Sequence, residues 1–326
     1  MFEIEKNIFV IEVPLPGNPL KSINIYLIKG TDRNLMIDTG FNMPLCYETL
    51  MRGLKEINVQ MKNTDIFLTH LHSDHTGLSS TLIEPDNKIF IGETDKMYMK
   101  EFFGSEYWNW LDDKYVSYGF SRRELEENQL LNPASLYLPS QQGGQTSVND
   151  GTIIDLGTYK FKCVETPGHT PGHMCLFDEE KGIFFSGDHI IFDITPNITS
   201  WRYVENSLKL YLQSLDKIKT LDISSTFSAH RKPIGDCHAR VNELLAHHGR
   251  RLEEAYEIVK NNHSGWINPY AVASQMTWSI RARNWGEFPV TQKWFAVGEA
   301  VAHLEYLHLE GRISRELSEG IYYYCI

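Results

Sequence analysis

The stretch "THLHSDHTG" (residues 69–77) places three histidines and one aspartate within six residues, directly after the apolar run "DIFL". The whole chain contains only 13 histidines. Imidazole nitrogens and carboxylate oxygens are the ligands that zinc, iron and manganese take in proteins. His70 and His72 alternate with Leu71, so an extended backbone points both imidazoles the same way. The spacing therefore predicts a metal site at the end of a strand.

Later segments of the same kind also place a histidine or an aspartate at the end of a predicted strand. "ETPGH" ends at His169, "FFSGDH" contains Asp188 and "TFSAH" ends at His230, while "MIDTG" upstream contains Asp38. Loops that follow strands can turn several side chains towards one point. Together with the first cluster, these segments offer five histidines and two carboxylates for metal binding, with Asp38 in addition.

Apolar runs and turn residues predict the strands and helices that position these residues. Short β-rich runs in residues 7–40 are followed by a predicted helix at 42–58 and strands at 65–70 and 88–93. Residues 159–230 repeat this order, with one apolar helical face between 208 and 218. Two similar β-then-α halves predict an α/β fold in which two sheets pack together with helices outside, a four-layer sandwich.

Residues 95–146 interrupt this pattern with an aromatic-rich, helical insertion, which ends in the hinge-like stretch "SQQGGQ". Long insertions in compact domains often form lids or pocket walls. Two hypotheses stay open: the rings hold the insertion together, or they line the substrate pocket. For the second we expect contributions from Phe103, Trp108 and Trp110.

From about residue 236 the pattern changes to three helices followed by a β-hairpin. This is the order of elements in a small winged-helix module. We expect two domains, residues 1–235 and residues 236–326.

The composition narrows the classes of function. Apolar residues make up 42% and charged residues 22%, a balance typical of globular proteins, and the formal net charge is −11. This charge disfavours non-specific binding to nucleic acid and to anionic membranes. No secretion signal or apolar run of membrane-spanning length is present, and the five cysteines form no CxxC pair. We expect a cytoplasmic protein with reduced thiols, without membrane or nucleic-acid partners, and a homodimer is compatible with the sequence.

The motifs "THLHSDHTG", "TPGHTPGH", "SGDH" and "SAH", in this order and with "MIDTG" upstream, resemble the metallo-β-lactamase superfamily. Within it the chain is most similar to glyoxalase II-like hydrolases, over roughly residues 5–235. The tail resembles the winged-helix domain of proteins of the beta-lactamase-like protein 2 type. The implied fold is a four-layer αββα metallo-β-lactamase sandwich with a small C-terminal winged-helix-like α+β domain.

The resemblance also implies a role for each ligand. It assigns three histidines to one metal site and two histidines with an aspartate to a second, with Asp188 bridging and Asp38 supporting the ligand loop. His173, in the repeated "TPGH", is not the family's ligand. Asp74 and Asp188 are also the residues expected to be catalytic. The two sites are His70, His72 and His169 for the first, and Asp74, His75 and His230 for the second.

The implied function is a hydrolase with two divalent metal ions, zinc first and iron or manganese as alternatives. A hydroxide held between two such ions would attack a small acyl substrate, a thioester as the first choice and a lactone as the second. His189 is a further candidate for substrate contact. A true β-lactamase is disfavoured, because "SGDH" supplies an aspartate where lactamases often use cysteine. Two alternatives stay open: an endoribonuclease of the winged-helix type, and an iron-dependent sulfur dioxygenase.

Overall fold

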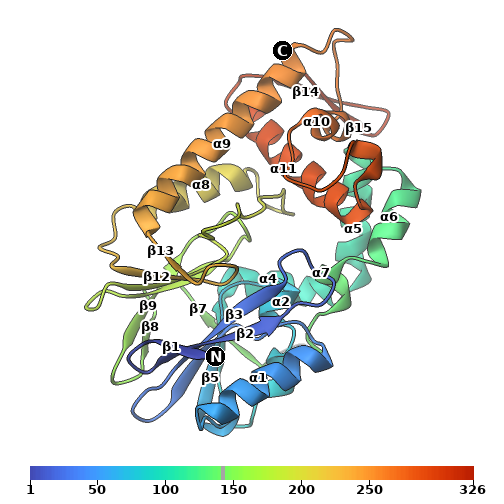
Figure 1. Cartoon of the computed structure of the whole chain (residues 1–326). Coiled ribbons are helices and arrows are strands. Elements are labelled where there is room, and N and C mark those ends of the chain that lie inside the picture. The colour runs from blue at the N-terminus through green and yellow to red at the C-terminus, as the bar shows by residue number, and fades with distance from the viewer. Residues whose placement is uncertain (141–143) are drawn as a thin grey trace. The chain divides into compact units, whose positions relative to one another are not determined.

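The computed structural model describes residues 1–140 and 144–326, which form two compact units (Figure 1). The sandwich unit comprises Met1–Phe103, Pro133–Pro196 and Ser214–Val241, and the second unit comprises Gly104–Asn132, Asn197–Gln213 and Asn242–Ile326. Contacts thus group residues 104–132 of the insertion with the C-terminal part. The domain boundary expected at residue 235 stays a prediction. The hinge expected at "SQQGGQ" (residues 140–145) includes residues 141–143, which lie outside the described residues, so it stays a prediction.

The first sheet of the sandwich unit has seven strands in sequence order. Strands β1 to β4 form an antiparallel meander, and β4 to β7 run parallel to one another. Asp38 directly follows β4 and Thr69 directly follows β5, so the two residues meet at one edge of the sheet. The strands are β1 (Phe2–Glu5), β2 (Ile8–Pro14), β3 (Ser22–Ile28), β4 (Asn34–Ile37), β5 (Thr64–Leu68), β6 (Ile89–Gly92) and β7 (Gln145–Val148).

The second sheet has six strands in the order β13-β12-β11-β10-β9-β8. Its pairs are antiparallel except β11 with β12, which are parallel and are connected through α8 (Ser207–Ile218). The strands are β8 (Ile153–Asp155), β9 (Lys160–Glu165), β10 (Met174–Asp178), β11 (Ile183–Gly187), β12 (Ser225–Ser228) and β13 (Ile234–Gly235).

The two sheets pack face to face through one apolar core. The ring of Tyr26 on β3 lies 5.1 Å from that of Phe185 on β11. Val10 on β2 belongs to this core, whereas its neighbour Ile11 points to the opposite face, where it meets Gly53 of α1 (Pro44–Glu56). This alternation lets one strand serve the sheet–sheet core and the helix layer together. The expected sandwich of two sheets flanked by helices is confirmed.

Short helices complete the sandwich unit and carry the insertion. They are η1 (Met61–Asn63), α2 (Ser73–Thr76), α3 (Ser79–Leu82), α4 (Glu93–Phe102) and α7 (Pro133–Leu136). Only α4 and α7 of the insertion belong to this unit; α5 (Ser105–Ser117) and α6 (Arg122–Gln129) belong to the second one. The insertion is therefore helical, as expected, but is shared between the units.

The second unit contains the expected C-terminal helices and hairpin. Tyr115 of α5 is buried and stacks on Trp294 of α11, with ring centroids 4.7 Å apart. The small C-terminal α+β part is confirmed, and its winged-helix character stays a prediction. In the described ranges, no helix combines the length and apolar character needed to cross a membrane. The elements are α9 (Cys237–Lys260, entering from the sandwich unit), α10 (Pro269–Gln275), η2 (Trp285–Glu287), α11 (Val290–Leu309), β14 (Ser314–Ser318) and β15 (Ile321–Cys325).

Candidate metal centre

The histidine-rich loop begins where β5 ends. All five residues of β5 are buried, so the strand fixes the start of the loop firmly. The chain bends over residues 69–72, with His72 in extended backbone, and the short helix α2 then brings Asp74 and His75 round to the same side. His70 and His75 are fully buried, whereas His72 is partly exposed.

The other candidate ligands also follow strand ends. His169 follows β9, Asp188 follows β11 and His230 follows β12, all on the second sheet. The structure brings these residues together with the loop after β5. Three groups have ligand atoms that all lie within 4.8 Å of one another: His70, His72 and His169; His70, His75 and Asp188; and Asp74, His75 and His230.

The first group matches the first expected metal site. Nδ1 of His72 lies 2.9 Å from Nε2 of His70 and 3.1 Å from Nε2 of His169. Three imidazoles around one point are a donor set that suits zinc or iron.

The second group matches the second expected site. Nε2 of His230 lies 3.3 Å from Nε2 of His75 and 3.3 Å from Oδ2 of Asp74. Here one carboxylate accompanies two imidazoles.

Asp188 lies between the two groups with one oxygen towards each. Its Oδ1 is 3.6 Å from Nε2 of His75 and 3.4 Å from Nε2 of His230, and its Oδ2 is 3.7 Å from Nε2 of His169. A carboxylate in this position can contact two metal ions at once. The donor set therefore fits two ions in its geometry and in its chemistry.

Neighbouring groups orient the imidazoles. Nδ1 of His75 lies 2.8 Å from Oδ2 of Asp38, and Nδ1 of His230 donates to the carbonyl oxygen of Ser22 at 2.9 Å. A carbonyl can only accept, so the proton of neutral His230 is on Nδ1 and the lone pair of Nε2 faces the cluster. Hydrogen bonds of this kind fix the rings of metal-binding histidines.

The pKa values of the candidate ligands shift in opposite directions. Burial lowers the pKa of His72 to about 3, so this ring stays neutral and able to ligate. Burial would also lower the pKa of His75, but the carboxylates of Asp38, Asp188 and Asp74 outweigh it and raise the pKa well above its usual value. The carboxylates thus favour a cation beside His75, which a proton or a metal ion can supply.

His173 and His189 lie outside the three groups. Nε2 of His173 accepts the backbone N–H of Asp188 at 3.1 Å, and its Nδ1 is 2.8 Å from Oγ1 of Thr166. This ring supports the Asp188 loop, in line with its exclusion as a ligand. His189 is fully buried, and burial lowers its pKa to about 3. A buried ring offers little surface for substrate contact.

Asp95 is a supporting residue that sequence reasoning missed. Its buried carboxylate accepts hydrogen bonds from Leu71 N–H (2.9 Å), Thr170 Oγ1–H (2.7 Å) and Gly172 N–H (2.6 Å). It therefore links the loop of His70 and His72 to the loop of His169. A Cβ on Gly172 would lie 2.3 Å from the backbone nitrogen of Asp95, so the close approach requires glycine. Burial raises the pKa of Asp95 to about 7.

The aromatic residues expected in a pocket wall are divided between the units. Phe103 belongs to the sandwich unit and is exposed, whereas Trp108 and Trp110 are half-buried on α5 of the second unit. The guanidinium of Arg202 lies over the ring of Trp110, 5.5 Å from its centroid. Tyr115, on the same helix, is buried in the core of its own unit. The roles of Phe103, Trp108 and Trp110 stay predictions.

Comparison with known proteins agrees with this geometry. The profile described as "Metallo-beta-lactamase superfamily" matches residues 18–230, and the one described as "Metallo-beta-lactamase-like, C-terminal domain" matches residues 286–325. A metallo-beta-lactamase family protein from Thermus thermophilus has a solved structure with a TM-score of 0.82 and 26% identity, covering 99% of both chains.

Two curated relatives illustrate the range of lengths and names. "Probable metallo-hydrolase YqjP" of Bacillus subtilis is 23% identical over 95% of this chain and 94% of that protein. "Atrochrysone carboxyl ACP thioesterase" of Emericella nidulans is 24% identical over 74% of this chain and 61% of that protein. For three fungal lactamase-like proteins, the match spans only 58% to 62% of their length.

Proposed function

The chain belongs to the metallo-beta-lactamase superfamily, and on that basis we propose that it is a metal-dependent hydrolase of thioesters. The observation that carries this proposal is the convergence of five histidines and two aspartates from four loops, with Asp188 facing both groups. We propose that two divalent ions bind there, zinc first and iron or manganese as alternatives. Their ligands would be His70, His72, His169, Asp74, His75 and His230, with Asp188 shared.

When bound, such ions activate water near neutral pH and polarise an acyl oxygen. The protein's own residues hold the candidate ligands in position. Asp38 and Ser22 hold the rings of His75 and His230, and His173 fixes the backbone of Asp188. Asp74 and Asp188 are the only two carboxylates in the three groups, and their negative charge favours cations there.

A thioester is favoured over other acyl substrates by its leaving group. A thiol has a pKa near 8.5, so it departs as a thiolate with little help from a general acid. The relative from Emericella nidulans is also named as a thioesterase. A lactone is the second choice, because it too is an ester that needs no amide-type protonation.

The ion pairs of the second unit support a small-molecule substrate over RNA. Two arginines of the C-terminal part face acids of the same unit: Arg251 contacts Glu299 at 3.2 Å, and Arg312 contacts Glu253 at 3.0 Å. Arginines neutralised in this way offer little charge to phosphates. We therefore propose a small acyl substrate without a nucleic-acid or membrane partner. Cytoplasmic location and homodimerisation stay predictions from the sequence.

The test is metal analysis of purified protein paired with a substrate panel of thioesters, lactones, single-stranded RNA and a low-molecular-weight persulfide. We expect turnover of thioesters that is lost with a chelator and restored by zinc. RNA cleavage without thioester turnover would overturn the proposal in favour of the ribonuclease. Persulfide oxidation with one iron per chain would favour the dioxygenase.

A further inference from the structure

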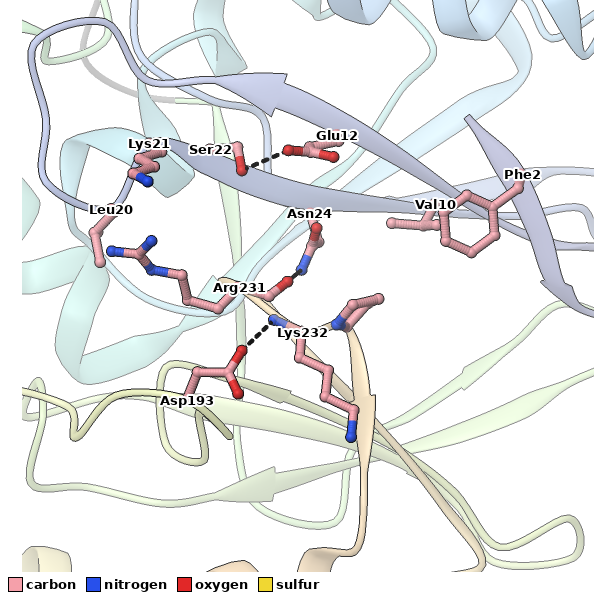
Figure 2. A pocket seen from close by; sticks show the side chains of 11 residues that line it. Phe2, Val10, Glu12, Leu20, Lys21, Ser22, Asn24, Asp193, Arg231 and Lys232 are labelled. Atoms are coloured by element: carbon pink, nitrogen blue, oxygen red, sulfur yellow. Dashed lines mark hydrogen bonds between the residues drawn. The ribbon is translucent and has the colours of Figure 1, made fainter.

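The sandwich unit contains a pocket of about 340 Å³ beside the turn that carries His230 (Figure 2). It lies between the start of β3, the outer strands and the turn after β12. Its lining residues are Phe2, Val10, Glu12, Leu20, Lys21, Ser22, Asn24, Asp193, Arg231, Lys232 and Pro233.

Hydrogen bonds connect this pocket to the candidate metal centre. The side-chain amide of Asn24 donates to the carbonyl oxygens of Ser228 (3.1 Å) and Arg231 (3.2 Å), which fixes the turn. Ser22 lines the pocket, and its carbonyl accepts from Nδ1 of His230. A group bound in the pocket is therefore separated from a candidate metal ligand by a single residue.

Three cationic side chains line the pocket: Lys21, Arg231 and Lys232. In the view of Figure 2, the guanidinium of Arg231 and the ammonium of Lys21 lie at the same end, beside Leu20, and the ammonium of Lys232 lies at the other. Among the residues that the structure describes, none of the three forms an ion pair. Like charges that share one concave surface repel each other, and a bound anion would offset this repulsion.

The guanidinium of Arg231 has unused donors. One terminal nitrogen donates to the carbonyl of Pro19 at 2.6 Å, which holds the group in place. Its Nε is buried and has no hydrogen-bond partner in the described part of the chain. A buried donor without a partner in a native protein calls for an explanation. The terminal N–H groups that do not contact Pro19 can donate to an anionic oxygen in the pocket.

The two cationic residues at this end share an unusual backbone conformation. Lys21 and Arg231 adopt φ of 71° and 63°, in the left-handed region that long side chains rarely occupy. Such conformations persist where the surrounding structure imposes them, and they concentrate at functional sites. Asp38, which supports the metal loop, shares this conformation with φ of 63°.

The two carboxylates of the lining neutralise the three cations only in part. Glu12 accepts a hydrogen bond from Ser22 Oγ–H at 2.9 Å, and Asp193 accepts one from the backbone N–H of Lys232 at 3.1 Å. The lining keeps one cation in excess, in a chain whose formal net charge is −11.

We propose that this pocket binds a carboxylate or phosphate group carried by the substrate. Arg231 would form a charge-assisted, bidentate contact with the anion, and Lys21 would supply a second charge. The inference that the anion is part of the substrate rests on the proposed thioesterase function. It specifies the substrate class: a thioester with an anionic group remote from the acyl carbon.

The first test is direct binding to the metal-loaded full-length protein. Inorganic phosphate and succinate are titrated by calorimetry into the wild type, Lys21→Gln, Arg231→Gln and the control Lys62→Gln, an exposed lysine elsewhere on the sandwich unit. We expect the Kd to rise about tenfold in each pocket variant, as lost contacts to a charged group predict. Metal content is measured in parallel, because Arg231 adjoins His230. Unchanged affinity in Lys21→Gln and Arg231→Gln would mean that anions bind at the metal centre or adventitiously, and would overturn the proposal.

The second test separates this pocket from the proposed function. Thioesters with one acyl group but a neutral, a carboxylated or a phosphorylated thiol are compared by KM and kcat. In Lys21→Gln we expect KM to rise about tenfold more for one of the anionic thioesters than for the neutral one, and the thioester affected identifies the anion. Equal changes for all three would overturn the assignment to the substrate. A wild type that hydrolyses none of them, yet loses phosphate affinity in the variants, would overturn the proposed function and support the anion site.

Discussion

Oδ2 of Asp38 lies 2.8 Å from Nδ1 of His75, and both side chains are buried. The other oxygen of the same carboxylate accepts the backbone N–H of Thr69 at 2.8 Å. One residue thus sets the ring of a candidate ligand and the start of the loop that carries four of them. Its φ of 63° places it where aspartate and asparagine are the most tolerated of the non-glycine residues.

Replacing Asp38 with asparagine should weaken metal binding and leave the protein folded. Asparagine fits the same backbone conformation and can still accept from Thr69, but it removes the charge beside His75. We expect metal affinity to fall about 10- to 100-fold, the usual effect of losing such a support. Competition with a chromophoric chelator measures it. Wild-type affinity in Asp38→Asn would show that the ring of His75 is oriented by other contacts.

Purified protein should contain about two metal ions per chain, as a centre with a shared carboxylate requires. His72→Ala should abolish turnover and lower the metal content, with the fold intact because His72 is partly exposed and not part of the core. Elemental analysis, activity and thermal unfolding are compared with the exposed control His263→Ala. A single ion in a fully active preparation would rule out the dinuclear site, and unfolding of His72→Ala would make the residue structural.

Asp95→Asn should loosen both ligand loops at once. An amide in place of the carboxylate turns a donor towards at least one of Leu71 N–H, Thr170 Oγ1–H and Gly172 N–H, so a buried hydrogen bond is lost. We expect the free energy of unfolding to fall by about 1–3 kcal/mol, and metal affinity to fall with it. Thr170→Val is the matched variant, because it removes only one of the three bonds and should have the smaller effect on affinity. Reduced stability with wild-type metal affinity would limit Asp95 to a structural role.

The candidate ligands could be predicted because each lies in a recognisable motif that follows a strand, and strand ends converge at one edge of a sandwich. Asp95 could not, because a single acid in the first turn of a helix is common on protein surfaces. Its partners Leu71 and Gly172 are 24 and 77 positions away, and only the folded chain brings them together. The same holds for Tyr115, whose hydroxyl donates to the carbonyl of Trp294, 179 positions away. A run of aromatic residues cannot show which rings serve the core and which remain accessible.

Trp108 and Trp110 are half-buried on α5, between the buried Tyr107 and Leu111. If they line the substrate pocket, Trp108→Ala and Trp110→Ala should raise KM or lower kcat with a melting temperature close to that of the wild type. Tyr115→Leu is the core control and should lower the melting temperature, because it removes the stacking on Trp294. If both tryptophan variants instead melt much earlier and the surviving protein has normal kinetics, the rings only hold the helix in place.

His303 should make the second unit sensitive to acid. It is fully buried, donates from Nδ1 to the carbonyl of Glu299 at 2.7 Å, and has its Nε2 3.2 Å from Nδ1 of His248. Burial lowers the pKa of His303 to about 3. The unfolded chain, with a histidine pKa near 6.5, binds a proton that the folded protein does not bind. Stability that is present above pH 6.5 is therefore lost as the pH falls below it.

A single histidine of this kind reduces the free energy of unfolding by up to about 1.4 kcal/mol for each pH unit below 6.5, or about 2 kcal/mol at pH 5. His303→Gln replaces the ring with a neutral amide and should flatten the dependence of stability on pH between 6.5 and 5. The replacement also changes packing around position 303, so the absolute free energy of unfolding does not test the prediction. The change of this free energy with pH does. Denaturant unfolding at both pH values measures that slope, with the exposed His263→Gln as the control. A slope in His303→Gln equal to that of the wild type would show that His303 does not titrate differently in the two states, and that the acid sensitivity has another source.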